Sequence, residues 1–147
     1  MRKSLVAIAV VLLSGSIGSG QDKRPIHVVI HAAPTQIKKA ALAMFEPNGY
    51  RLDSDTSSQL KISKPFTGEE TAAYNTAHWT SQPLANCRHV NTFSLSPTDD
   101  SVDVALERFM ECRSDGFFRI ARIGDEKQKD SVQGTLTVLK TKAEQKQ

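Results

Sequence analysis

Two cysteines, Cys87 and Cys112, are the residues whose types and spacing point most directly to chemistry. They flank two strand-like runs, residues 88–96 and 102–113, which are separated by turn-forming residues. A turn centred on residues 99–100 places the two cysteines opposite each other in an antiparallel pair, close enough for a disulfide. The alternative, a redox-active pair, lacks a Cys-x-x-Cys motif and a third thiol for exchange. The spacing therefore predicts a structural disulfide.

The same register predicts which face of this hairpin is apolar. It sets Phe93 opposite Leu106 on the face that carries the cysteines, and the neighbouring pairs on that face are mostly apolar as well. Asn91 opposite Arg108 is the one polar pair there. We expect this face to carry the core.

The histidines do not have the spacing of a metal site. His27 and His31 fall on one face of a predicted strand, but four residues of strand separate them by roughly 13 Å, too far for one ion. His89 lies on the cysteine-bearing face and His78 near the end of a short predicted helix. We therefore expect no metal and no cofactor.

Other catalytic patterns are also incomplete. Residues 53–57 start like a calcium loop, but Ser58 stands where the loop needs glycine and Lys64 where it needs glutamate. Glu107 and Glu111 alternate along the outward side of a strand, and neither a nucleophile elbow nor a phosphate loop is present in the sequence. These observations predict that the protein has no catalytic residues and is not an enzyme.

The amino-terminal segment has the pattern of a cleavable secretory signal. Arg2 and Lys3 precede nine apolar residues, 5–13, and a run of small residues, 14–20. Nine apolar residues are too few to span a bilayer. Ser16 stands where a bacterial lipoprotein would carry its lipidated cysteine, so no membrane anchor is expected after cleavage.

This interpretation divides the chain into a signal peptide, residues 1–20, and a single secreted domain, residues 21–147, that is secreted or periplasmic. Removing the two basic residues of the signal reduces 19 basic residues to 17, against 16 acidic ones. The net charge of the remaining domain is therefore close to zero, and its basic residues do not form a cluster flanked by aromatic residues. Both features argue against nucleic acid as a partner.

The remaining pattern predicts an α+β fold: an antiparallel sheet of about five to six strands with two to three helices packed on one face and one disulfide. The order of these elements resembles that of small periplasmic α+β modules, including those in accessory proteins of outer-membrane assembly, which is a likeness of fold and not of function. The expected elements are a strand at 26–32, a helix from 34 or 35 that closes at 47–49, a hairpin whose turn is 53–59, a short helix that opens with a capping box at 67–70, a three-stranded meander and a terminal helix.

Two of these predictions set the register of the chain after the disulfide hairpin. Residues 114–116 are expected to form a three-residue turn that places Phe118 opposite Cys112. Apolar residues at helical spacing after Asp130, which would be the N-cap, favour a helix over a strand for the carboxy-terminal segment.

The connection between residues 65 and 86 carries the candidate binding surface: Phe66, Tyr74, His78 and the only tryptophan, Trp79. Aromatic side chains in such a connection can anchor a partner, or they can cover the core as a lid. With the export signal and the missing catalytic patterns, this surface predicts a soluble exported binding or accessory module that acts on a protein or cell-envelope component. The alternatives are a small-molecule carrier with a pocket between sheet and helices, and a hydrolase built from scattered residues.

Overall fold

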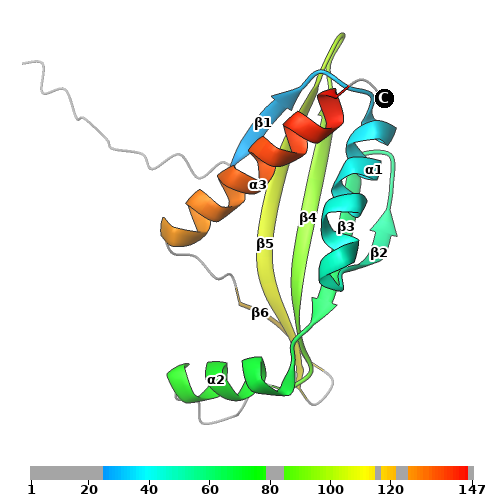
Figure 1. Ribbon diagram of the computed structural model, residues 1–147. Helices are drawn as coiled ribbons and strands as arrows, with labels where there is room; N and C mark the ends of the chain where they lie inside the picture. The colour runs from blue at the N-terminus through cyan, green and yellow to red at the C-terminus, as the bar shows by residue number, and fades with distance from the viewer. Residues whose placement is uncertain (1–24, 79–84, 115–116, 122–125, 146–147) are drawn as a thin grey trace, which may run out of the picture.

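A computed structural model describes residues 25–78, 85–114, 117–121 and 126–145. In these ranges it confirms the predicted α+β fold, with three α-helices on a six-stranded antiparallel sheet (Figure 1). The elements are β1 (His27–Ile30), α1 (Pro34–Phe45), the 3₁₀ turn η1 (Glu46–Asn48), β2 (Arg51–Asp55), β3 (Gln59–Pro65), α2 (Gly68–His78), β4 (Cys87–Pro97), β5 (Val102–Ser114), β6 (Phe117–Ala121) and α3 (Glu126–Glu144).

The long β4–β5 hairpin forms the centre of the sheet. Its register is the predicted one, with Cys87 opposite Cys112 and Phe93 opposite Leu106. The strand order is β1-β5-β4-β3-β2, and β6 pairs with β5 beyond β1 on the same edge. The hairpin therefore connects two ends of the sheet that are covered by different helices.

The predicted register of the following strand is wrong by one residue. Arg119, and not Phe118, lies opposite Cys112, and Ala121 lies opposite Met110. The cause is the length of the turn: Ser114 pairs with Phe117 and so belongs to the strand, which leaves two connecting residues instead of three. An Asp-Gly pair is a strong signal for a two-residue hairpin, and the three-residue interpretation overlooked it.

The β2–β3 turn is also shorter than predicted. The strands extend to Asp55 and restart at Gln59, because Asp53 is absorbed as an irregularity in the ladder between Leu52 and Ser54. The predicted end of the first helix is confirmed: α1 runs into η1, and Gly49 follows with a φ of 85°, a left-handed conformation that suits glycine.

Helices α1 and α3 cover the same face of the sheet. Ile37, Ala41 and Phe45 of α1 are buried there, and the terminal helix is confirmed with its predicted stripe buried. This core consists of Ile30, Ile37, Ala41, Phe45, Leu60, Ile62, Phe93, Leu95, Val102, Val104, Leu106, Val132, Leu136, Leu139 and Ala143.

The start of α3 differs from the prediction. It begins at Glu126, so Asp130 lies inside the helix and is not its N-cap. The residues that precede Asp130 are good helix formers, and the helix extends through them.

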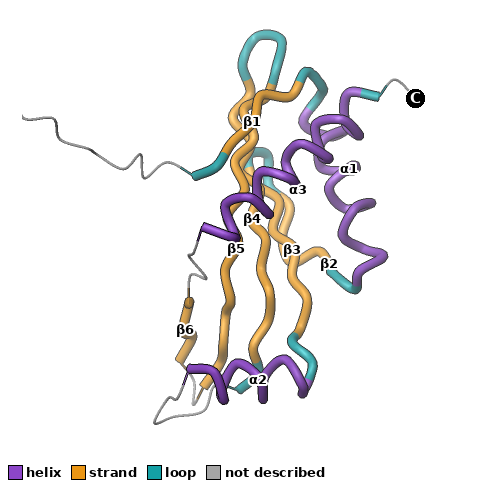
Figure 2. The backbone as a smooth tube through the Cα atoms, turned by 60° about the vertical axis from the view of Figure 1, so that its left-hand side comes forward, coloured by secondary structure: helices purple, strands orange, loops and turns teal. Residues whose placement is uncertain are grey.

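The outer edge of β1 is closed by side chains from α3. Lys140 Nζ donates to the backbone oxygen of Val29 at 2.9 Å, and the His31 backbone N–H donates to Glu144 Oε1 at 2.8 Å. Figure 2 shows α3 passing beside β1, whereas α2 lies across the opposite end of the sheet from α1 and α3. One edge of the sheet is thus protected against further pairing.

Candidate functional site

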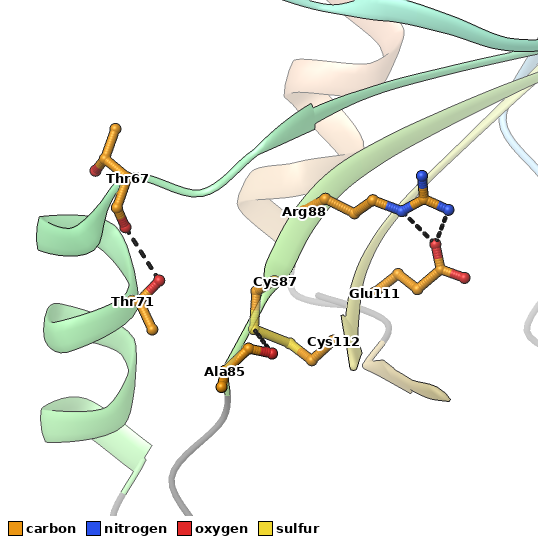
Figure 3. The surroundings of a disulfide bond; sticks show 7 residues. All are labelled: Thr67, Thr71, Ala85, Cys87, Arg88, Glu111 and Cys112. Carbon is orange, nitrogen blue, oxygen red and sulfur yellow. Dashed lines mark hydrogen bonds and ion pairs between the residues drawn. A yellow bond between two sulfur atoms is a disulfide. The ribbon is translucent and has the colours of Figure 1, made fainter. Parts of the chain in front are cut away.

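The predicted disulfide is confirmed at the end of the sheet that α2 covers. Cys87 and Cys112 are bonded, with their Cα atoms 4.0 Å apart and their side chains 5% and 1% exposed (Figure 3). With Met110 they form a second apolar cluster, separate from the main core. We call this cluster, with the residues that pack on it, the disulfide end.

Two of the four predicted surface residues pack onto the disulfide end. Phe66 and Tyr74 are partly buried against the cysteines and Met110, and the Phe66 backbone N–H donates to Cys87 O at 2.9 Å. The Phe66 ring also packs on the His89 ring, with their centroids 4.1 Å apart. These two aromatic residues therefore hold α2 on the sheet.

The side chains of the other two residues of the predicted surface, His78 and Trp79, fall outside the described part of the chain. His78 is the last residue of α2, and all of Trp79 lies outside the described residues. The display of Trp79 to a partner stays a prediction.

The capping box predicted for α2 is confirmed. Glu70 N–H donates to Thr67 Oγ1 at 3.1 Å, and Thr67 N–H donates to Glu70 Oε2 at 2.7 Å. The hydrogen bond from the Thr67 backbone is the main cause that lowers the pKa of the Glu70 carboxyl, and His89, whose Nε2 lies 3.2 Å from Glu70 Oε1, also lowers it. The helix start is thus tied both to its own backbone and to β4.

We predict that Glu70→Ala destabilises α2 by about 1 kcal/mol at pH 7, because the capping bond is lost. Glu69→Ala is the matched control, since Glu69 is exposed in the same first turn and has no described bonding partner. Because the pKa of Glu70 is lower in the folded state, its contribution is present above the unfolded value and is lost as the pH falls through the folded one. Amide exchange in α2 at pH 7 and pH 3 tests this, and equal effects of the two variants at pH 7 would contradict it.

The face of the sheet opposite the helices carries an ion-pair network centred on Arg88. Its Nη1 lies 3.0 Å from Asp53 Oδ2. Its Nε donates to Glu111 Oε2 at 2.6 Å, a contact that Figure 3 shows. Ser63 Oγ donates to the other oxygen of Asp53 at 2.7 Å. Both carboxylates are therefore occupied by one guanidinium, an arrangement that favours a structural role over acid–base chemistry.

The polar pair predicted on the apolar face connects the sheet to α3. Arg108 donates to Asn91 Oδ1 at 2.8 Å, and to the side-chain oxygens of Ser131 and Thr135 at 2.7 Å each. Burial lowers the pKa of the Arg108 guanidinium, whose described partners are all neutral. Sequence reasoning identified this pair but not its helical partners, because nothing in the sequence said which helix lies above it.

His27 and Asp55, a residue of the calcium-like run, are engaged in other contacts. His27 Nδ1 lies 2.8 Å from Asp103 Oδ1, and Lys38 of α1 contacts Asp55 Oδ1 at 2.5 Å. In the described ranges no three His, Cys, Asp or Glu side chains gather as a metal site requires. Nor is any helix of the described chain both long and apolar enough to cross a membrane.

No protein-family model matches this chain, and no curated protein matches it. Three of the side chains described above connect elements: Arg88 links β4 with β2 and β5, Arg108 links β5 with α3, and His89 links β4 with α2. The chemistry of the described site is that of a crosslinked support for a helix.

Proposed function

We propose that this protein is an exported, non-enzymatic binding module whose partner is a protein of the cell envelope. The amino-terminal signal pattern supports export. The buried disulfide supports it too, because such bonds persist in oxidising compartments and are rare in the cytosol.

The observation that carries the proposal is the placement of α2. The main core is covered by α1 and α3, whereas α2 lies apart from them across the disulfide end (Figure 1). Its inner side packs through Tyr74, and its outer side exposes small residues, among them Ala72, Ala73 and Thr76. A helix that does not close the core, and that rests on a crosslinked base, is suited to contact with another molecule.

The ionisable groups support a non-catalytic role. The pKa shifts of Glu70 and Arg108 have structural causes, a helix cap and burial beneath α3. Catalytic groups are typically perturbed by one another within a cleft. Glu70 does pair with His89 at 3.2 Å, but the His89 ring packs on the Phe66 ring, which suits a structural contact between α2 and β4. The described partners of Arg108 are neutral side chains of β4 and α3.

The filled layer between the sheet and α1 and α3 favours a binding surface over a carrier. Phe93, Leu136 and Leu139 lie at its centre and are at most 1% exposed. The edge-to-face contact between Phe45 and Phe93, with centroids 5.9 Å apart, adds to this packing. A ligand in this layer would have to displace well-packed core side chains.

Site-specific photo-crosslinking tests the proposal. A crosslinking amino acid at Ala73, on the exposed side of α2, should form an adduct with one defined protein in envelope extract, and excess unlabelled protein should compete for it. The matched control is the same amino acid at Thr137, which is exposed on α3. No adduct at Ala73, with a lipid bound to the protein in native mass spectrometry, would overturn the proposal in favour of a carrier.

A further inference from the structure

A second surface, independent of α2, lies where α1 meets the end of α3. It is a hollow of about 280 Å³ lined by Gln36, Lys39, Ala40, Ala43, Lys142, Ala143 and Gln145. We call it the basic hollow. Its lining combines lysine and amide donors with alanines, and it contains no carboxylate.

The two lysines of the basic hollow are the unusual feature. Among the described residues, Lys39 and Lys142 have no ion pair and no hydrogen-bond partner. Their neighbours differ: Lys38 pairs with Asp55 at 2.5 Å, and Lys140 with Glu144 at 3.7 Å. Two positive charges therefore line one hollow that has no carboxylate in its lining, and neither is used in a described ion pair.

The neighbouring carboxylates are directed elsewhere. Glu144, next to Ala143 in the chain, accepts a hydrogen bond from the backbone of His31 at the edge of β1. The adjacent hollow on the other side of α1 shares Lys39 and Ala43 with the basic hollow, but its lining also has Glu46 and Asp55, so its charges are mixed. An anion is therefore attracted to the basic hollow more than to its neighbour.

The rest of the lining suits a side chain and not a large ligand. Gln36 uses its Oε1 to accept from Ala33 N–H at 3.2 Å, which leaves its amide NH₂ as a donor. The small alanine side chains leave room for the backbone of a partner to approach closely. Their methyl groups can contact the methylene groups of an acidic side chain. Lysine provides a point charge, which a single carboxylate can satisfy.

We propose that the basic hollow binds a glutamate or aspartate side chain of a partner protein, between Lys39 and Lys142. A membrane is the less suitable source of the anion. Stable electrostatic attraction to lipid headgroups typically takes four to eight clustered basic residues, whereas the hollow has two lysines.

The test is an NMR titration of the isotopically labelled protein with a helical peptide that presents glutamates four residues apart. The glutamine version of the peptide is the probe for charge. We expect changes in the chemical shifts of Ala40 and Ala143 with the glutamate peptide and none with the glutamine peptide. In the double variant Lys39→Gln and Lys142→Gln the affinity should fall roughly tenfold, since two exposed ion pairs are lost.

The control removes the same charge elsewhere. Lys129→Gln with Lys61→Gln leaves the hollow intact, because Lys129 is exposed earlier in α3 and Lys61 lies over Phe109 on the other face of the sheet. Equal losses in the two double variants would show unspecific attraction and overturn the proposal. So would the absence of peptide binding, including the case in which phosphatidylglycerol vesicles bind through the same lysines.

The outcome is separable from that of the proposed function. The Ala73 adduct depends on α2 and should persist in the Lys39→Gln and Lys142→Gln variant, unless one partner occupies both surfaces. Glutamine is a good helix former and both positions are on the outside of helices, so circular dichroism should show an unchanged fold.

Discussion

Replacement of both Cys87 and Cys112 by alanine is expected to lower the free energy of unfolding by roughly 2 to 5 kcal/mol. The bridge closes a loop with a sequence separation of 25, and a loop of this size is worth roughly 3 to 4 kcal/mol through the restricted entropy of the unfolded chain. Loss of the two buried sulfur atoms adds a packing cost. The effect should be greatest at α2, whose inner side rests on this cluster.

Urea unfolding of the oxidised, reduced and doubly substituted protein measures this effect. The reduced protein keeps the cysteine side chains, so it separates the contribution of the crosslink from that of packing. Amide exchange should show α2 opening before the β4–β5 hairpin, since the hairpin retains its ladder and its main core. Midpoints that coincide for the oxidised and reduced proteins would contradict the expectation, as would two free thiols in non-reducing peptide mapping.

The second large effect is expected at Arg108. Arg108→Met should cost about 2 to 4 kcal/mol, because the guanidinium makes three hydrogen bonds and Asn91, which is 1% exposed, would lose the donor to its side-chain oxygen. Methionine has a similar length and is apolar, so the loss reports on the hydrogen bonds more than on volume. The part of α3 around Ser131 and Thr135 should become more open to exchange.

Arg51→Met is the matched control for Arg108. Arg51 is exposed in β2 and has no described ion pair, so the same substitution should change stability by no more than about 0.5 kcal/mol. Both variants are compared by urea unfolding at one pH and salt concentration. If Arg108→Met were as mild as Arg51→Met, Arg108 would be a solvated side chain and not a connection between sheet and helix.

The parts of the fold that could be predicted are those set by local pattern. The β4–β5 register follows from a short turn between two alternating strands, and it carries the disulfide with it. The cap of α2 follows from four consecutive residues, and the stripe on α3 from helical spacing. In each case the partners are close in sequence, or related through one turn.

The wrong predictions are those in which the length of a turn or the register of a strand changes by a single residue. In the turn before β6, Ser114 joins the strand, and this shifts every later pair by one position. In β2, Asp53 is accommodated as an irregularity because Ser63 and Arg88, from two other strands, bond its carboxylate. Such long-range contacts leave no periodic signal in the sequence.

The candidate site illustrates the same limit. The sequence places Phe66, Tyr74, His78 and Trp79 in one connection, and this predicts a common surface. The tertiary structure packs the first two against the disulfide, a contact between residues that only the folded sheet brings together. The residue types indicate an aromatic surface. Whether an aromatic side chain faces solvent or the core depends on the apolar cluster it packs against, which the sequence alone does not show. The sequence likewise does not predict that Lys39 and Lys142 share a hollow, because α1 and α3 are far apart in the chain.

The closed edge of β1 has a consequence for the order of folding. β1 is the first strand of the chain, it pairs with β5 far along the sequence, and its outer edge is closed by residues of α3, the last helix. Until that helix docks, the backbone of β1 presents unpaired groups that can template pairing with another molecule. Chains interrupted before Lys140 would keep this edge open permanently. We therefore expect the last turns of α3 to protect the chain against aggregation once they have docked on β1.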